Sequence, residues 1–282
     1  MTGYYDNGTG IHGFVYSNGT YTTLDDTATL PGVTHAHGIN DSGTVTGYFA
    51  DAFGDHGFVY SNGTYTTLDD PSATGKATFA LGINGSGAVT GFYSNGTGIH
   101  GFVLSNGTYT TLDDPSATEF TFAFGINASG TVTGYYYDAI GIHGFIDSNG
   151  TYTTLNYPSH TGATSVYGIN DSGVVVGKYT DSSGPHGFVY SNGTYTALDD
   201  PSAANGIYTS GTVATGINDS GVVVGYYYDA AGNVHGFTAV PAVSAVPEPA
   251  SLAMLAMGTL IVAGYGAVRS ARSRRRLAPS GV

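Results

Sequence analysis

Six histidines recur at one position of a repeated phrase, and imidazole groups gathered in this way could bind a metal ion. No second type of metal ligand stands near them in the sequence, and repeat proteins reproduce packing residues in every unit. We therefore expect one structural hydrogen bond per unit from these histidines. The phrase is His-Gly-Phe, and its copies begin at His12, His56, His100, His143, His186 and His235. A single His-x-His, at His35 and His37, is a further metal candidate.

Pairs of aspartates close most of the repeats, and such carboxylates could bind Ca²⁺ outside the cell. The pairs are Asp25-Asp26, Asp69-Asp70, Asp113-Asp114 and Asp199-Asp200, whereas one unit has Asn156-Tyr157 instead. One pair per unit supplies few ligands, and Asp before Pro commonly starts a turn. The sequence therefore favours turn formation and predicts no cofactor. Asp69, Asp70, Asp113 and Asp114 remain the candidates for a calcium site.

No motif in the chain indicates catalysis. Cysteine is absent, and Glu119 and Glu248 are the only glutamates. The chain has no Gly-x-Ser-x-Gly elbow, no His-Glu-x-x-His and no phosphate-binding loop. The aspartate pairs are repeated, whereas an active site is a single asymmetric arrangement of residues. We predict that the protein is not an enzyme and that no residue is catalytic.

The charge divides the chain into two different parts. The 282 residues carry a formal net charge of −13, which argues against a nucleic-acid partner because phosphate binding needs clustered Lys and Arg. Residues 1–246 hold two lysines and nineteen acidic residues, a net −17, and residues 247–282 hold five arginines and one glutamate, a net +4. All the arginines therefore belong to the C-terminal part.

The elements that carry these residues are short strands. His-Gly-Phe recurs at spacings of 43, 44 or 49 residues, and Gly-Ile-Asn recurs with it at 43, 44 or 48. Within one unit, segments rich in Tyr, Val, Thr, Ile and Phe alternate with turn signals such as Asn106-Gly107. These segments are Ala77–Asn84, Ala88–Tyr93, Ile99–Leu104 and Tyr109–Asp113. Each unit is thus predicted to be a four-stranded antiparallel sheet.

Four strands in about 44 residues is the size of a β-propeller blade. A β-solenoid is the alternative, although its coils are usually shorter. We predict an all-β, propeller-like array of four-stranded repeats over residues 1–240, with incomplete first and last units. Thr2–Asp26 supplies the last three strands of a unit and Val213–Val240 the first three, giving twenty-two strands in all.

The C-terminal segment has the composition of a membrane anchor. A proline-containing linker at 241–249 precedes an uncharged apolar run at 250–268, which is long enough for a transmembrane helix. Basic residues follow at Arg269, Arg272, Arg274, Arg275 and Arg276. By the positive-inside rule they stop transfer and keep residues 269–282 in the cytoplasm, with the repeats on the opposite side.

Two family resemblances follow from these motifs. Val246–Ser251, with Pro247, Glu248 and Pro249, followed by the apolar run and the arginines, resembles the PEP-CTERM sorting signal of Gram-negative bacteria. That resemblance implies export, recognition by an exosortase, cleavage near the Pro-Glu-Pro motif and a fate at the cell surface or outside the cell. Such proteins often accompany exopolysaccharide production.

The repeats resemble the HAF family of extracellular repeats. The resemblance rests on Gly168-Ile169-Asn170-Asp171-Ser172-Gly173, His186-Gly187-Phe188 and Ser191-Asn192-Gly193-Thr194. Glycine replaces the alanine of the family's His-Ala-Phe, and the resemblance implies no defined activity. Export requires an N-terminal signal, whereas polar, turn-rich sequence follows Met1 directly. We therefore expect the start of the protein to lie upstream of Met1.

The combined prediction is an exported, non-enzymatic structural or binding module of the cell envelope or exopolysaccharide matrix. Its loops, rich in Tyr, Asn and Asp, would face an extracellular polysaccharide or an envelope protein. The runs Tyr135–Tyr137 and Tyr226–Tyr228 could stack on sugar rings, with half of each run in the core. Two alternatives remain: a propeller enzyme that degrades polysaccharide, as a lyase or glycosidase, and a calcium-stabilised adhesin.

Overall fold

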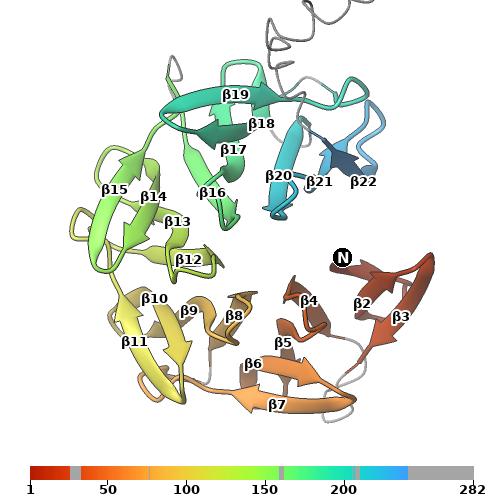
Figure 1. The fold of residues 1–282 in the computed structure, drawn as a ribbon, viewed down its shortest axis with the longest axis vertical. Coiled ribbons are helices and arrows are strands. Elements are labelled where there is room, and N and C mark those ends of the chain that lie inside the picture. Colours follow the sequence, from red (N-terminus) through yellow and green to blue (C-terminus); the bar gives the residue numbers. More distant parts are fainter. Residues whose placement is uncertain (26–32, 76, 159–161, 205, 207–209, 241–282) are drawn as a thin grey trace, which may run out of the picture. The chain divides into compact units, whose positions relative to one another are not determined.

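The computed structural model describes residues 1–25, 33–75, 77–158, 162–204, 206 and 210–240. These residues form six antiparallel sheets that are arranged as blades around a ring, a six-bladed β-propeller (Figure 1). The prediction of an all-β propeller is confirmed, and the ring excludes a solenoid. Residues Met1–Val240 make up one compact unit.

The blades follow one another along the chain, and their strands have the following bounds. Blade 1 consists of β1 (Thr2–Asp6), β2 (Ile11–Ser17) and β3 (Thr20–Leu24). Blade 2 consists of β4 (Thr34–Ile39), β5 (Val45–Asp51), β6 (Gly54–Ser61) and β7 (Thr64–Leu68). Blade 3 consists of β8 (Thr78–Ile83), β9 (Val89–Asn95), β10 (Gly98–Ser105) and β11 (Thr108–Leu112).

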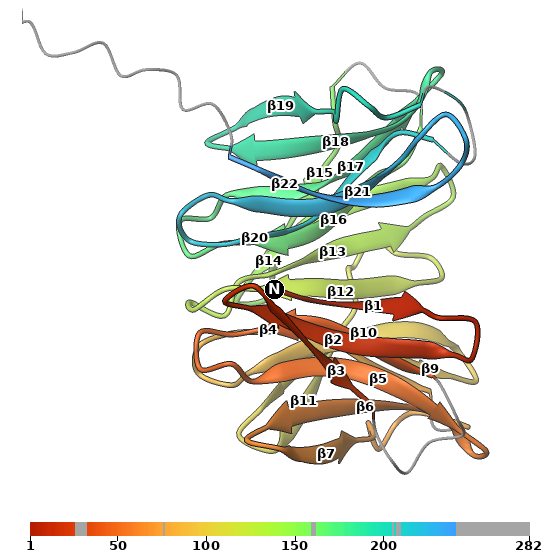
Figure 2. The same cartoon turned by 90° about the vertical axis from the view of Figure 1, so that its right-hand side faces the viewer.

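Blade 4 consists of β12 (Thr121–Ile126), β13 (Val132–Tyr137), β14 (Ile142–Ser148) and β15 (Thr151–Leu155). Blade 5 consists of β16 (Thr164–Ile169), β17 (Val175–Asp181), β18 (Gly184–Ser191) and β19 (Thr194–Leu198). Blade 6 consists of β20 (Thr212–Ile217), β21 (Val223–Tyr228) and β22 (Val234–Ala239). Blades 1 and 6 are neighbours in the ring, as the side view shows (Figure 2).

Each four-stranded blade is a simple meander whose strands run outward in chain order. The strands β4, β8, β12, β16 and β20 lie toward the middle of the ring and are called the inner strands below (Figure 1). The strands β3, β7, β11, β15 and β19 lie at its periphery and are called the outer strands (Figure 1). The third and outer strands are joined by Asn-Gly hairpins. In the hairpin of blade 3, Asn106 and Gly107 have φ values of 50° and 76°, as a type I′ turn requires.

The repeated His-Gly-Phe phrase builds the contact between strands and between blades. Phe102 is fully buried, and its ring covers Gly91 of the neighbouring strand β9, where a Cβ atom would collide with the ring and with the Phe79 carbonyl. At Gly101, a Cβ atom would lie 3.3 Å from the Ala123 Cβ of the next blade. The phenylalanine therefore fills its own blade, and the glycine lets the next blade approach.

In the first four Gly-Ile-Asn phrases the asparagine side chain links one blade to the next. Its Oδ1 accepts a backbone N–H of its own turn, as from Ala88 to Asn84 at 3.0 Å. Its Nδ2 donates to the backbone carbonyl of the corresponding asparagine one blade further, as from Asn84 to Asn127 at 3.0 Å. The same donation runs from Asn40 to Asn84, from Asn127 to Asn170 and from Asn170 to Asn218, at 3.1, 3.3 and 3.1 Å. We call this series the asparagine ladder.

The C-terminal predictions lie outside the described residues. They are the linker at 241–249 with Pro247, Glu248 and Pro249, the helix at 250–268, and the arginines Arg269, Arg272, Arg274, Arg275 and Arg276. Within the part of the chain that the structure describes, no helix is long and apolar enough to cross a membrane.

Substitution of a buried member of the asparagine ladder should destabilise the propeller. Asn84→Ala removes the bond to Asn127 and the bonds to its own turn, so we expect the free energy of unfolding to fall by about 1–3 kcal/mol. Asn218→Ala is the matched control, because Asn218 is exposed and, among the described residues, its side chain bonds only its own turn. Chemical denaturation of the full chain measures both values. Equal losses would contradict the role of the bond between blades.

Candidate functional site

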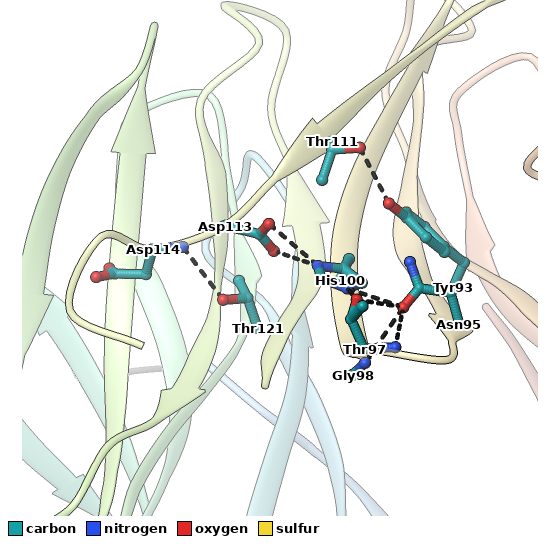
Figure 3. Close-up of polar contacts among 9 residues, drawn as sticks. All are labelled: Tyr93, Asn95, Thr97, Gly98, His100, Thr111, Asp113, Asp114 and Thr121. Atoms are coloured by element: carbon teal, nitrogen blue, oxygen red, sulfur yellow. Dashed lines mark hydrogen bonds and ion pairs between the residues drawn. The ribbon is translucent and has the colours of Figure 1, made fainter. Parts of the chain in front are cut away.

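In blades 2 to 5 the histidine of the repeat sits between two polar partners of its own blade. In blade 3, His100 Nδ1 lies 2.9 Å from Asp113 Oδ1, at the end of the outer strand (Figure 3). His100 Nε2 lies 3.2 Å from Asn95 Oδ1 and 3.1 Å from Thr97 Oγ1, in the hairpin after β9. The imidazole ring stacks on Tyr93 with the ring centres 5.2 Å apart. Both ring nitrogens of His100 are therefore engaged within the blade.

Blades 2, 4 and 5 repeat this arrangement with different chemical groups, and blades 1 and 6 keep one contact of it. His56 Nδ1 lies 2.7 Å from Asp69, and His186 Nδ1 lies 2.9 Å from Asp199. His143 Nδ1 lies 2.8 Å from Asn156 Oδ1, in the unit that has no aspartate pair. In blades 1 and 6 the corresponding contacts are His12 Nδ1 to Asp25 at 2.9 Å and His235 Nε2 to Asp229 at 2.8 Å. An oxygen acceptor recurs in each blade, whereas a charged acceptor does not.

The two aspartates of a pair have different partners. Asp113 faces His100, whereas the carboxylate of Asp114 points the other way (Figure 3). The backbone N–H of Asp114 donates to Thr121 Oγ1 at 3.1 Å, and its Oδ1 accepts the backbone N–H of Ser116 at 2.8 Å. Asp69 and Asp70 are separated in the same way, because Asp69 faces His56 and Asp70 caps the N–H of Ser72. Across the described ranges, no three His, Cys, Asp or Glu side chains gather as a metal site.

A second group of side chains forms aromatic contacts that run from blade 1 to blade 5 on the inner strands and their neighbours, and blade 6 adds the separate pair Tyr226 and Tyr228. Ring centres are 4.5 Å apart for Tyr4 and His35, and 4.9 Å apart for Tyr48 and Phe79. Contacts continue through Phe92 and Phe122, with ring centres 4.9 Å apart. We call the whole group the aromatic belt: Tyr4, His35, His37, Tyr48, Phe79, Phe92, Phe122, Phe124, Tyr135, Tyr137, Tyr167, Tyr226 and Tyr228.

Strand alternation explains where the belt lies. Phe79 and Phe92 are directly opposite each other on β8 and β9, as are Phe122 and Tyr135 on β12 and β13. The intervening residues, such as Ala80 and Ala123, are buried in the core. Most belt residues are half-buried, and Tyr4 and His37 are exposed. The inner strands, which lie toward the middle of the ring (Figure 1), carry the belt residues His35, His37, Phe79, Phe122, Phe124 and Tyr167.

The belt carries polar groups that are neutral at neutral pH. Burial raises the pKa of Tyr48 and Tyr167 to about 12, so both phenols keep their protons. Burial raises the pKa of Tyr226 as well, and Tyr167, Tyr228 and Tyr4 of three blades raise it further. Burial lowers the pKa of His35, so its imidazole is mostly neutral at neutral pH. The belt thus combines apolar ring faces with uncharged hydrogen-bonding groups.

The two tyrosine runs lie in the second strands of their blades. Tyr135 to Tyr137 lie in β13, and Tyr226 to Tyr228 lie in β21. In the first run Tyr136 is buried in the core, whereas Tyr135 and Tyr137 join the belt. In the second run all three tyrosines are half-buried, so the expectation that half of each run lies in the core fits the first run only. Sequence reasoning missed the belt residues Tyr48, Phe79, Phe92 and Phe122 as a site, and it singled out His35 and His37 as a metal candidate only. The available signal was the aromatic ring that recurs at the second residue of the inner strands β4, β8 and β12, which is His35, Phe79 and Phe122.

Comparison with known proteins identifies the sorting segment. Residues 245–275 match the PEP-CTERM protein-sorting motif, which confirms that prediction. The motif indicates export, a cell-surface or extracellular fate and processing by an exosortase. No curated protein sequence matches the chain. The resemblance of the repeats to the HAF family stays a prediction.

Solved structures show the same fold at low sequence identity. The fucose-specific lectin from Aleuria aurantia is 14% identical, with 86% of this chain and 88% of the lectin covered at a TM-score of 0.52. A mutant of AofleA from Arthrobotrys oligospora is 13% identical, with 82% and 76% covered at a TM-score of 0.52. TolB from Acinetobacter baumannii is 14% identical, with 65% and 46% covered at a TM-score of 0.51. The chain thus spans less than half of the TolB chain.

The contact of His186 should make stability depend on pH. Burial alone would lower the pKa of His186, but the hydrogen bonds and charges of Asp199 and Asp181 outweigh burial and raise it. Because the pKa of His186 is higher in the folded state, the protonated imidazole stabilises the fold. This stabilisation is complete below the unfolded pKa of about 6.5 and is lost as the pH rises through the folded pKa.

We expect His186→Gln to lower the free energy of unfolding more at pH 5.5 than at pH 8, in urea denaturation of the full chain. Asp181, whose pKa is lowered to about 2 by Ser183 first and by His186 to a smaller extent, stays ionised at both pH values. The same loss at both pH values would contradict a stabilised imidazolium.

Proposed function

We propose that this protein is an exported, surface-sorted and non-enzymatic binding module of the cell envelope or extracellular matrix, and that its aromatic belt binds a neutral glycan. The observation that carries the proposal is the belt itself. Aromatic side chains are placed in contact from blade to blade, yet most of them are only half-buried. In the core, by contrast, the phenylalanines Phe58, Phe102, Phe145 and Phe188 are fully buried.

The chemistry of the belt suits sugar rings. Aromatic faces offer flat apolar surface for the C–H faces of a sugar, and a few placed polar groups fix the orientation of a ligand. The protonated phenols of Tyr48 and Tyr167 can donate to sugar hydroxyls. Residues 1–246 carry a net charge of −17, which repels anionic polymers and favours an uncharged ligand.

The similar structures are compatible with this proposal. A fucose-specific lectin has the same fold as this chain, at 14% identity. At this identity the likeness concerns the fold, so the support for glycan binding comes from the belt and its electrostatics. The recurring histidines are assigned a structural role, since each ties a hairpin or an outer strand to its own blade.

In this proposal the C-terminal segment is the sorting signal that directs the protein to the cell surface. The apolar run at 250–268 anchors the chain in the membrane before processing, and the arginines after it stay in the cytoplasm. An exosortase then cleaves near Pro247, Glu248 and Pro249, and the propeller is released or attached at the surface.

Removal of a belt ring should weaken glycan binding. A glycan array probed with the full chain identifies the best neutral glycan, and titration calorimetry then gives its Kd. For Tyr135→Leu, which keeps apolar bulk but removes the ring, we expect a Kd about tenfold higher, or roughly 1.4 kcal/mol. Tyr21→Leu is the matched control, because Tyr21 is 68% exposed on the outer strand β3. Equal affinity of the two variants would contradict binding at the belt.

The same purified protein tests the absence of enzymatic activity. A reducing-end assay on each polysaccharide that binds should show no product after prolonged incubation. Release of new reducing ends would favour a glycosidase or lyase instead.

Processing should depend on the glutamate of the sorting motif. We expect Glu248→Ala to leave the chain uncut and in the membrane fraction, because the Pro-Glu-Pro motif is the recognition element of the segment. Glu119→Ala is the control, since Glu119 is the other glutamate and is exposed in the propeller. Immunoblots of membrane and medium fractions, with intact mass, give the result. Cleavage of the Glu248 variant at the normal rate would contradict this assignment.

A further inference from the structure

One blade carries a carboxylate at a position that is otherwise aromatic or aliphatic. Two residues after the phenylalanine of His-Gly-Phe, blade 4 has Asp147, and the other blades have Tyr16, Tyr60, Leu104, Tyr190 and Ala239. In blade 2 the ring of Tyr60 lies 4.7 Å from that of Tyr65, and in blade 5 Tyr190 and Tyr195 are equally close. Asp147 therefore replaces one ring of an aromatic pair, opposite Tyr152.

Asp147 is buried and only partly satisfied. It is 5% exposed, on β14 of blade 4. The backbone N–H of Gly150 donates to its carboxylate. Its Oδ1, however, is buried and has no hydrogen-bond partner among the described residues. A buried carboxylate oxygen without a partner costs free energy, so this oxygen needs an explanation.

A second such oxygen comes from the preceding blade. Asp114 is 3% exposed, and its Oδ1 accepts the Ser116 N–H, whereas its Oδ2 is buried without a partner in the described part of the chain. The turn that Asp114 starts continues to Ala117, which packs against the same apolar cluster as Tyr152. Asp114 and Asp147, which pairs with Tyr152, thus both lie at the junction between blades 3 and 4. The carboxylate of Asp114 also points away from Asp113 and His100 (Figure 3).

The junction has negative charge without a basic side chain to balance it. Burial raises the pKa of Asp147, the Gly150 amide opposes that effect, and the charge of Asp114 raises the pKa further. Tyr152 is affected by the same groups, since burial and then Asp147, Asp114 and Asp113 raise its pKa. Of the residues that the structure describes, Lys178 alone is a Lys or Arg, and it lies in β17 of blade 5. Among the described residues, no Lys or Arg side chain of blades 3 and 4 therefore offsets the charge of these two carboxylates.

We propose that Asp114 Oδ2 and Asp147 Oδ1 bind a hard divalent cation, such as Ca²⁺, between blades 3 and 4. Carboxylate oxygens are the ligands that Ca²⁺ prefers, and water and neighbouring backbone oxygens complete the coordination of such sites. The site differs from the sequence-predicted one, because its two carboxylates come from different blades and not from one aspartate pair. The cation site is also separate from the aromatic belt, so the test of cation binding does not depend on whether the belt binds a glycan.

The experiment compares Ca²⁺ responses of the full chain, purified in detergent and freed of metal with a chelator. Ca²⁺ at a hundredfold excess over its Kd should raise the melting temperature at pH 7 by about 5 °C. We expect this rise to disappear in Asp147→Asn and in Asp147→Tyr, which restores the residue of blades 1, 2 and 5. Asp70→Asn is the matched control. Asp70 occupies the same turn position as Asp114, but the next blade has Leu104 at the position where blade 4 has Asp147. That variant should keep the full rise.

Three results would overturn the proposal. One is a melting temperature that Ca²⁺ at millimolar concentration does not change in the unsubstituted chain. Another is an unchanged rise in Asp147→Tyr, which would place the cation elsewhere. The third is stabilisation on lowering the pH from 7 to 5 without any response to Ca²⁺, which would indicate a proton shared by the two carboxylates. Circular dichroism of the Asp147 variants confirms that each is folded.

Discussion

The side-chain hydrogen bond from one Gly-Ile-Asn asparagine to the next fixes how neighbouring blades sit against each other. Blade faces are covered mainly by apolar side chains, and apolar contact alone has little directional preference. Asn84 adds direction, because its Oδ1 holds its own turn while its Nδ2 donates to the Asn127 carbonyl. These bonds are buried, so leaving either partner unpaired would be costly. The position of each inner strand, and hence of every side chain on it, depends on this ladder.

The candidate sites follow from that alignment. Along an inner strand, alternate residues point to opposite faces, so a blade can bury Ala123 in its core and present Phe122 to the belt. Contacts between belt rings of different blades, such as Phe92 and Phe122, require the two blades to be in register. The junction of Asp114 and Asp147 requires the same, because its two carboxylates belong to successive blades. At the periphery, His100 and Asp113 secure the outer strand without contributing to either site.

The repeat made the fold readable from the sequence. The repeat spacing of about 44 residues predicted a four-stranded blade, and the Asn-Gly dipeptides predicted the hairpins. The Tyr, Val, Thr, Ile and Phe content of the segments predicted the all-β class. The belt was harder to predict, because an aromatic residue such as Phe79 fits a buried face and a half-exposed face equally well. Which face is exposed depends on how the blades close into a ring, a long-range property. The partner of Asp114 was equally hidden, since Asp147 is far from it in sequence and the adjacent Asp113 turned out to face His100.

Repetition and departure from it carry different meanings in this chain. A residue that recurs in the blades, such as the asparagine of the ladder, solves a problem that every blade has, namely packing against the next one. A residue that occurs once cannot be explained by that shared problem. Asp147 replaces a tyrosine and gives up an aromatic pair, which is a loss of stability unless something else binds there. The departures are therefore where specific chemistry should be sought, and the repeats provide the internal control because the consensus residue shows what packing alone would require.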